Sequence, residues 1–197
     1  MRRPRVQAPP AFTVELPSGN DQFLNEAQSL ELLGKHGVPV VPMQLCQTAD
    51  DARRAFERIS GGGSRVVMKA CSRDIPHKSE HGLVALNVAS ADEASTLFDR
   101  FWNKMDALKA ARDGVIVAAM HKGRHEFMVG AHIDPVFGPV VVVGDGGKYT
   151  EALNDCIVLM PPFSAAEVQA ALRTLRIAPL FDGVRGESPM DIASLSE

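Results

Sequence analysis

A lysine and a histidine-containing loop stand between two short apolar runs, and their residue types suit the binding of phosphate groups. The first run is Val66–Met68, followed at once by Lys69, and the second covers residues 82–88. Short apolar runs bounded by turn residues are typical of buried strands. We therefore predict two strands, with Lys69 leaving the end of the first.

The connection between the two runs is polar and carries a proline and a glycine. Pro76 lacks an N–H group and Gly82 tolerates unusual dihedral angles, so we expect no helix here. A strand, a cationic loop and a strand can fold over a polyphosphate, whose oxygens accept hydrogen bonds from loop N–H groups, hydroxyls and ammonium groups. An ordinary exposed hairpin with solvated side chains is the alternative. The candidate residues are Asp74, His77, Lys78, Ser79 and Gly82.

The histidine of this loop allows two kinds of chemistry. A neutral imidazole nitrogen of His77 could accept a phosphoryl group, and adjacent cations would stabilise the phosphate. His77 and His81 are four residues apart, as zinc ligands on one helical face would be. The absence of a helix and of an H-E-x-x-H motif makes zinc the weaker hypothesis. His121 and His125 fall in a predicted surface turn.

Composition limits the class of protein. The chain has 197 residues, enough for one domain or two small subdomains, and its net charge of -3 gives no reason to expect a nucleic-acid partner. No apolar run could span a bilayer, and no signal-peptide core begins the chain. The three cysteines show no C-x-x-C spacing, which excludes a disulfide framework or zinc ribbon and suits a cytoplasmic protein.

Hydrophobic periodicity predicts an α+β (α/β) fold. Residues 1–20, rich in arginine and proline, are predicted to be a flexible arm or linker. Helices and strands alternate at first and a strand-rich middle follows, which suits two lobes gripping a ligand better than a doubly wound sheet. The expected helices cover residues 21–36, 48–59, 90–108 and 164–175, and the expected strands cover 38–45, 66–68, 82–88, 115–118, 126–133, 139–143 and 157–160.

The carboxylates in the second half of the chain are less specific indications of function. Glu126 opens a strand, where it could bond a ribose hydroxyl or form a surface ion pair with a neighbouring cation. Residues 144–147 have the sequence GDGG and are predicted to be a flexible loop. Glu151 and Asp155 follow it four residues apart and could face either a cation or solvent.

Neither G-x-G-x-x-G after a strand nor a P-loop motif occurs, so a Rossmann site is unsupported and a P-loop is excluded.

Three segments together resemble one family. They are VVMKACSRDIPHKSEHG at 66–82, EFMVGAHIDPVFGPVVVVGDGG at 126–147 and GVRGESPMD at 183–191. In this order and spacing they resemble the ATP-grasp domain of ADP-forming acyl-CoA synthetases, the acetate–CoA ligase family related to succinyl-CoA synthetase. The resemblance covers residues 25–195. It implies an ATP-grasp domain over residues 21–197, with a nucleotide cleft between two lobes.

The resemblance also implies roles for particular residues. Lys69 would contact the phosphates, and His77, Lys78, Ser79 and Gly82 would belong to the loop covering them. The backbone of the hinge residues Ala118, Ala119 and Met120 would meet adenine, and Glu126 would hold the ribose. One relay histidine would lie on the CoA-binding part, and His77 would be a second relay for the phosphoryl group. His77 and Lys69 are therefore the expected catalytic residues, with ATP or ADP and Mg²⁺ as the expected cofactors.

The family interconverts acid, CoA and ATP with acyl-CoA, ADP and phosphate, through an acyl phosphate and a phosphohistidine. The CoA-binding and ligase domains are not found in this sequence, so they are expected as partners, in the same polypeptide or as a separate subunit. No membrane partner is expected.

Some positions depart from the family pattern. Ala118 and Ala119 replace polar hinge residues, Leu83 replaces the second of two glycines, and Glu80 replaces an aspartate. The chain stops at Glu197, before the D-x-N-P strand pair and later aspartate that bind Mg²⁺ in the family. We therefore expect an incomplete ATP-grasp unit, either a fragment of a longer synthetase or a degenerate relative, with no turnover by itself. The alternative is a non-catalytic module that binds nucleotide or regulates. A third hypothesis is a protein-lysine acetyltransferase that carries this domain beside its acetyltransferase domain.

Overall fold

The computed structural model describes residues 24–75, 77–121, 123–147 and 150–196. The described part of the chain divides into two compact units, the first within residues 24–121 and the second within residues 123–196. The predicted arm at residues 1–20 lies outside the described residues, as does Pro76. The two units are described one at a time.

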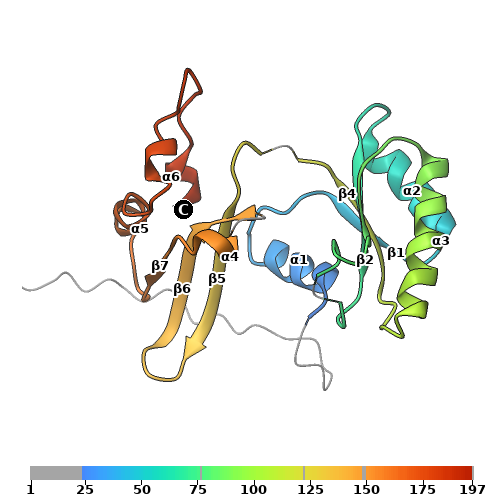
Figure 1. Cartoon of the computed structure of the whole chain (residues 1–197), viewed down its shortest axis with the longest axis horizontal. Coiled ribbons are helices and arrows are strands. Elements are labelled where there is room, and N and C mark those ends of the chain that lie inside the picture. The colour runs from blue at the N-terminus through green and yellow to red at the C-terminus, as the bar shows by residue number, and fades with distance from the viewer. Residues whose placement is uncertain (1–23, 76, 122, 148–149, 197) are drawn as a thin grey trace, which may run out of the picture. The chain divides into compact units, whose positions relative to one another are not determined.

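The first unit is built on a four-stranded antiparallel sheet with the order β1-β4-β2-β3. Strand β4 therefore pairs on both edges, with β1 and with β2 (Figure 1). The strands are β1 Met43–Cys46, β2 Val66–Cys71, β3 Val84–Val88 and β4 Gly114–Ala119, and the helices are α1 Glu26–Lys35, α2 Ala49–Ser60 and α3 Ala91–Ala107.

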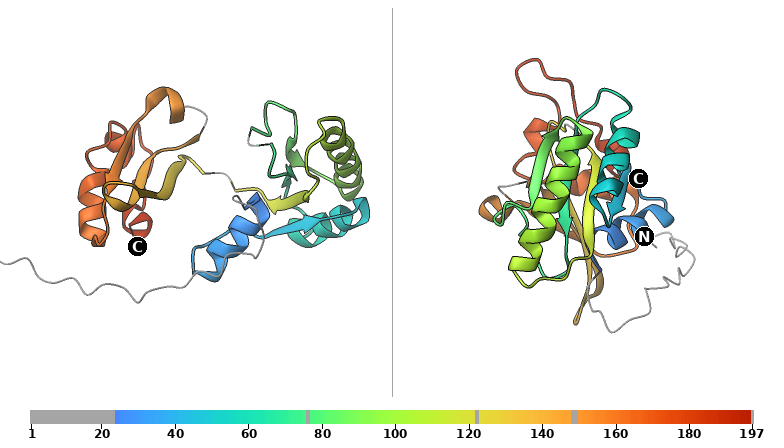
Figure 2. Two further views of the ribbon diagram at one scale, coloured as in Figure 1. Left: turned by 90° about the horizontal axis from the view of Figure 1, so that it is seen from below. Right: turned by 90° about the vertical axis from the view of Figure 1, so that its right-hand side faces the viewer.

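The alternation of side chains along β2 places its residues in two different environments. Val66, Met68 and Ala70 are buried in the cluster that includes the apolar faces of α2 and α3, which lie side by side (Figures 1 and 2). Val67 and Cys71 join a second cluster, together with Ala27 of α1. Successive side chains of a strand point to opposite faces, so Lys69 lies on the face that α1 covers.

Capping residues set the start of each helix in this unit. The Asn25 side chain accepts the N–H of Gln28 and the Gln28 side chain accepts the N–H of Asn25, which forms a capping box at α1. Thr48 and Asp51 form the same arrangement at α2, and Ser90 caps α3. Helix α1 thus begins at Glu26, five residues after the expected start at residue 21.

The second unit contains a three-stranded antiparallel sheet with the order β5-β6-β7. One face carries Val143, which packs with Val168, Leu172 and Phe181 in a separate core. The elements are β5 Phe127–Asp134, β6 Gly138–Asp145, α4 Thr150–Leu153, β7 Cys156–Leu159, α5 Ala165–Leu172, the 3₁₀ helix η2 Ala178–Leu180 and α6 Ile192–Leu195.

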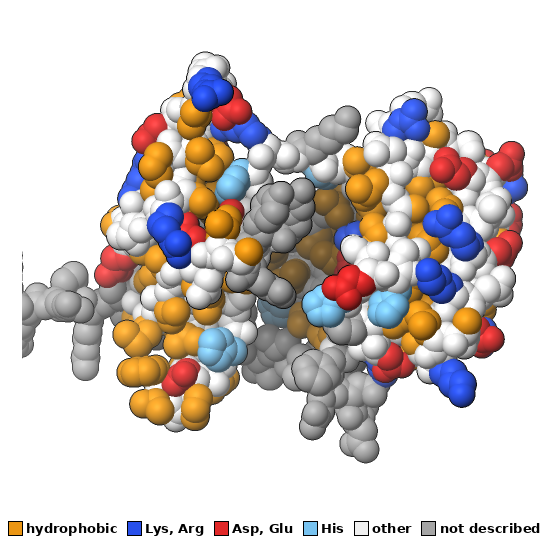
Figure 3. Space-filling view, viewed as in Figure 1, with side chains coloured by type: hydrophobic (Ala, Val, Ile, Leu, Met, Phe, Trp, Pro, Cys, Tyr) orange, Lys and Arg blue, Asp and Glu red, His pale blue; other side chains and the backbone are white. Residues whose placement is uncertain are grey.

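Apolar side chains gather at the turn between β5 and β6, and they stay in solvent. Asp134 accepts the N–H groups of Val136 and Phe137 and so fixes the turn. Val136 and Phe137 remain 80% and 68% exposed. The space-filling view shows hydrophobic side chains gathered over this end of the β5–β6 hairpin (Figure 3).

The predicted elements are largely present, with corrections at their ends. β2 continues to Cys71, so Lys69 lies within the strand and does not leave its end. β6 continues to Asp145, so Gly144 and Asp145 belong to a strand and not to a flexible loop. The short helices α4 and α6 were not predicted. Among the described residues, no helix has both the length and the apolar character to cross a membrane.

The core of the first unit gives a test of stability. Phe101 on α3 is fully buried, whereas Phe137 in the β5–β6 turn is 68% exposed. Because a cavity replaces the ring, Phe101→Ala should lower the free energy of unfolding by about 3–5 kcal/mol. The matched Phe137→Ala should change it by less than about 0.5 kcal/mol. Chemical denaturation followed by circular dichroism measures both, and equal effects would contradict the assigned core.

Candidate functional site

Lys69 is held at the centre of the first unit by strands on both sides. Its register partners are Val84 on β3 and Ile116 on β4. A lysine on a central strand keeps its backbone fixed while its four-carbon side chain reaches outward. Lys69 Nζ lies 2.9 Å from Glu26 Oε1, and the lysine side chain is 36% exposed.

Glu26 also binds the second predicted lysine. Lys78 Nζ lies 3.0 Å from Glu26 Oε2, so the two carboxylate oxygens each accept from a different ammonium group. The Lys78 side chain is 17% exposed and that of Glu26 is 25% exposed. The structure therefore brings together two of the predicted phosphate-binding residues, at one carboxylate.

The position of Glu26 suits a charged carboxylate. Burial raises the pKa of Glu26, but the hydrogen bonds and charges of Lys69 and Lys78 outweigh burial and lower the pKa below its ordinary value. Glu26 is also the first residue of α1, where the exposed N–H groups favour negative charge. The carboxylate therefore stays ionised at neutral pH, and the site carries two positive charges and one negative charge.

The 77–82 loop is a compact turn that ends in the core. The N–H of Glu80 donates to the His77 carbonyl, at 3.2 Å, and the N–H of Gly82 donates to the Ser79 carbonyl, at 3.0 Å. His77, Ser79 and Gly82 are exposed. The side chains of His77 and Ser79 are therefore accessible on the loop that carries Lys78.

Leu83 anchors the end of this loop. Its N–H donates to the Lys78 carbonyl and its carbonyl accepts from Ala70, both at 2.9 Å, and its side chain is fully buried. Gly82, just before it, has a φ of +58°, which favours glycine. The leucine that departs from the family pattern is thus a core residue that holds the loop against β2.

The three predicted hinge residues lie at the end of β4. Ala118 is buried, and the N–H of Ala119 donates to the Pro42 carbonyl at 2.9 Å. Met120 follows the strand and lines a hollow of about 430 Å³ together with Ser64, Arg65 and Asn87. The backbone of Ala119 is engaged in the sheet, so of the three residues predicted to form a hinge only Met120 lies beyond the strand pairing.

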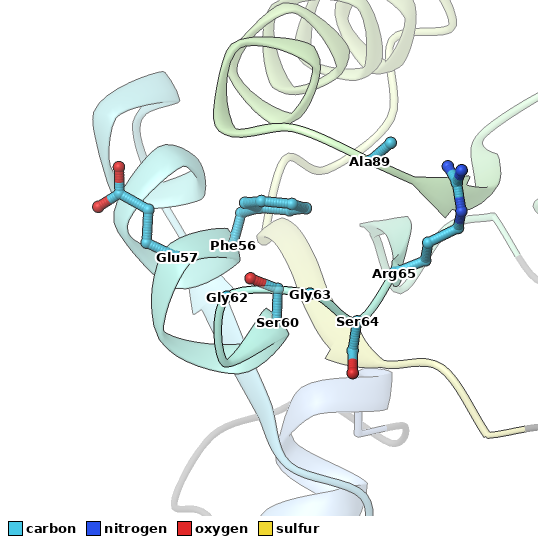
Figure 4. A pocket seen from close by; sticks show the side chains of 8 residues that line it. All are labelled: Phe56, Glu57, Ser60, Gly62, Gly63, Ser64, Arg65 and Ala89. Atoms are coloured by element: carbon cyan, nitrogen blue, oxygen red, sulfur yellow. The ribbon is translucent and has the colours of Figure 1, made fainter.

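A second hollow, of about 360 Å³, adjoins this region and contains no predicted site residue (Figure 4). It lies where α2 ends in a glycine turn, and Ser64 and Arg65 line both hollows. The Arg65 guanidinium donates to the Asn87 carbonyl at 2.9 Å. The residues that line the 360 Å³ hollow are Phe56, Glu57, Ser60, Gly62, Gly63, Ser64, Arg65 and Ala89.

Glu126 belongs to the second unit, just before β5. Its carbonyl accepts the N–H of Gly146 at 2.9 Å. A Cβ atom at Gly146 would lie 2.8 Å from the Glu126 carbonyl oxygen, and one at Gly147 would lie 3.1 Å from Glu126 Oε2. Close packing against the Glu126 backbone therefore requires glycine at Gly146, and the φ of +78° favours glycine at Gly147, so the segment is not simply a flexible loop.

His121 is exposed, as predicted, whereas His125 is only partly exposed. Its side chain is 19% exposed, and Nε2 lies 3.0 Å from Oδ1 of the buried Asp145. The angle of this contact does not suit a hydrogen bond. Among the described residues, the buried Nε2 of His125 therefore has no hydrogen-bond partner. Asp155 is also buried; its carboxylate accepts the N–H groups of Arg176 and Ile177, and Oδ1 lies 3.7 Å from the Arg176 guanidinium Nε. The cation that Asp155 faces is therefore an arginine of the same unit.

Comparison with known proteins gives the family. Residues 15–197 match the ATP-grasp domain family. The chain belongs to the ATP-grasp domain family.

Several relatives of this ATP-grasp domain are CoA ligases. A trans-feruloyl-CoA synthase of an unknown prokaryotic organism is 38% identical over 87% of this chain and 24% of its own length. The β subunit of ADP-forming acetate–CoA ligase I from Pyrococcus furiosus is 31% identical over 93% of this chain and 79% of that subunit. Acetyl-coenzyme A synthetase 1 from Ca. Korarchaeum cryptofilum has a TM-score of 0.79 and 27% identity, covering 88% and 75% of the two chains.

The chain spans about a quarter of the length of the first two curated relatives. Its α+β fold with two sheets agrees with the ATP-grasp fold predicted from the sequence. Both the predicted fold and the predicted family are therefore confirmed.

Sequence reasoning missed Glu26. It lies 43 residues before Lys69 and 52 before Lys78, so no local spacing links the three. The available signal was only an acidic residue in the first turn of a predicted helix, and the helix dipole explains such a residue by itself.

The charge of Glu26 predicts a pH-dependent stability. A lowered pKa in the folded state stabilises the fold above the unfolded pKa, and this stabilisation is lost as the pH falls through the folded pKa. At pH 7, Glu26→Gln should cost about 1–2 kcal/mol in the free energy of unfolding. The difference from wild type should shrink below the usual glutamate range of about pH 4.

Urea denaturation between pH 7 and pH 3 measures this difference. Glu31→Gln is the matched control, because Glu31 lies on the same helix and its ion pair with Lys35 is exposed. If the free energies of unfolding of wild type and Glu26→Gln differ by the same amount at every pH, Glu26 does not act through its charge.

Proposed function

We propose that this chain is the nucleotide-binding part of an ADP-forming acid–CoA ligase, an enzyme that interconverts acid, CoA and ATP with acyl-CoA, ADP and phosphate. Support comes from relatives named ADP-forming acetate–CoA ligases, among them a β subunit of which this chain covers 79%. The observation that carries the proposal is the convergence of Lys69 and Lys78 on one carboxylate, with Lys78 directly after the exposed His77.

The proposed ligand is ATP or ADP. The Ca. Korarchaeum cryptofilum synthetase is solved with Ca-AMPCP, which is a nucleotide analogue. In this chain, Lys69 and Lys78 would donate to the phosphate oxygens, with Ser79 and Gly82 in the covering loop. Ala118, Ala119 and Met120 would lie against adenine, and Glu126 would bond the ribose.

Mg²⁺ is the proposed metal cofactor, and when bound it would neutralise charge on the β- and γ-phosphates. Another structure of the Ca. Korarchaeum cryptofilum protein, 26% identical with a TM-score of 0.71, contains Mg-AMPPCP. The described residues contain no group of three or more histidines, cysteines or acidic residues that could hold a metal ion. We therefore assign no residue of this chain to Mg²⁺.

His77 is the proposed phosphoryl acceptor. A ring nitrogen would attack the γ-phosphorus of ATP, the bond from that phosphorus to the β,γ-bridging oxygen would break, and ADP would leave. The reverse transfer would form ATP from ADP. The structure with Mg-AMPPCP has a phosphohistidine segment that points towards the nucleotide-binding site. In this chain, the exposed His77 beside Lys78 would act as a second relay, in addition to a histidine on the CoA-binding part.

The proposed partners are CoA-binding and ligase domains, in the same polypeptide or in a separate subunit. Both arrangements occur among the relatives, since the chain spans 25% of one acetate–CoA ligase and 79% of a separate β subunit. We also propose that residues 21–197 form a single ATP-grasp domain. The proposed location is cytoplasmic, which is consistent with the free cysteines.

A non-catalytic nucleotide-binding or regulatory module is the second candidate. It is favoured by the hinge, where two alanines offer no polar side chain and the N–H of Ala119 already donates to Pro42. Such a module would bind nucleotide and transfer no phosphate. The two experiments below separate the candidates.

Nucleotide binding is the first test. The 197-residue chain should bind ADP in isothermal titration calorimetry. Lys69→Met should weaken binding about tenfold to a hundredfold, because a charged hydrogen bond to phosphate is lost. Lys35→Met removes an exposed lysine of α1 that pairs with Glu31, and it should leave the affinity unchanged. A wild-type chain that binds no ADP would contradict the proposed function.

Phosphoryl transfer is the second test. A complete synthetase containing this domain, incubated with [γ-³²P]ATP, should acquire acid-labile label on His77. His77→Asn should remove that label, because the acceptor nitrogen is lost. His81→Asn, which changes an exposed histidine of the same loop, should retain it. Nucleotide binding with equal labelling of His77→Asn and wild type would exclude His77 as the relay, and binding with no labelling of wild type would favour the non-catalytic module.

A further inference from the structure

We propose that Glu26 is a positioning residue for the phosphate site: its carboxylate bridges the ammonium groups of Lys69 and Lys78, and so holds both lysines where a nucleotide's phosphate chain needs them. This inference rests on the proposed function and adds a residue to it. It begins from the two distances of 2.9 and 3.0 Å that join the carboxylate to the two lysines.

The bridge joins parts of the chain that no local interaction links. Lys69 comes from β2, Lys78 from the 77–82 loop and Glu26 from α1. Each ammonium group has three N–H donors and Glu26 uses one from each, so donors remain for phosphate oxygens. Two ammonium groups bound to one carboxylate must lie close together, as two cations binding one phosphate chain would.

Glu26 is rigidly placed for this task. It is the first residue of α1, directly after the capping box formed by Asn25 and Gln28. Ala27, the next residue, is 5% exposed and packs with Cys71 at the end of β2. The carboxylate is therefore carried by backbone fixed on both sides, whereas each lysine reaches it through a flexible side chain.

The bridge also differs from an ordinary surface ion pair. The side chains of Glu26 and Lys78 are 25% and 17% exposed, whereas Glu31 and Lys35 on the same helix are 64% and 68% exposed. Exposed pairs of that kind contribute little because water competes for both charges. Glu26 is removed from much of that competition, and its two oxygens are shared between two cations.

Charge alone predicts the opposite effect on nucleotide binding. Glu26 is negative, so removing its charge would strengthen the attraction between the two lysines and a phosphate. Without the bridge, however, the two ammonium groups repel each other, and both side chains must be ordered when the ligand binds. Weaker binding after removal of Glu26 can therefore arise from lost positioning and not from the change in charge.

The experiment combines ADP affinity with lysine reactivity, in the 197-residue chain. Glu26→Gln should weaken ADP binding about tenfold in calorimetry, because two lysines must then be immobilised by the ligand. It should also speed the modification of Lys69 and Lys78 by acetic anhydride, followed by mass spectrometry without nucleotide. The matched Glu31→Gln should change neither the ADP affinity nor the reactivity of these two lysines. Circular dichroism checks that both variants are folded.

The outcomes separate this inference from the proposed function. If Lys69→Met lowers ADP affinity while Glu26→Gln leaves it unchanged or raises it, Glu26 does not position the lysines and the proposed function stands. If Glu26→Gln leaves the reactivity of Lys69 and Lys78 unchanged, the bridge is absent in solution and the inference is wrong. If neither Lys69→Met nor Glu26→Gln affects ADP binding, the phosphate site itself is wrong.

Discussion

The first unit depends on one constraint, the alternation of side chains along β2. Val66, Met68 and Ala70 must enter the core shared with α2 and α3, because that core contains most of the buried side chains of the unit. The same strand then necessarily turns Lys69 to the opposite face, where α1 packs. A single residue of slippage would bury the lysine among apolar groups, so core packing and the position of the charge are fixed together.

The loop after β2 is tied to the rest of the first unit near both of its ends. Asp74 accepts the N–H of Ala111 at 2.7 Å, and Leu83 both accepts from Ala70 and is fully buried. Lys78 lies between these anchors and binds Glu26. The loop therefore combines two fixed ends with an exposed middle at His77 and Ser79. This suits a segment that must present a side chain to a ligand while its ends remain part of the core.

The sequence predicted what local patterns encode. Helices α1, α2, α3 and α5 and all seven strands follow from periodicity and capping residues, since each of these signals lies within a few neighbouring positions. The sequence also placed Lys69 and Lys78 in one candidate site, because the strand and loop adjoin. It could not predict that β6 includes Asp145, since the GDGG sequence resembles a flexible turn until the pairing of Asp145 with Phe127 is known.

Glu26 shows where prediction from local patterns must end. Its role depends on the packing of α1 against β2, which brings together residues 43 and 52 positions apart. A glutamate in the first turn of a helix already has a sufficient explanation in the helix dipole, so its sequence position raises no question. Glu26 differs from Glu31, five residues further along α1, in its shielding from water and in the two lysines that face its two oxygens. The chemistry of the site is therefore set by tertiary packing, even though both of its cations can be read from the sequence.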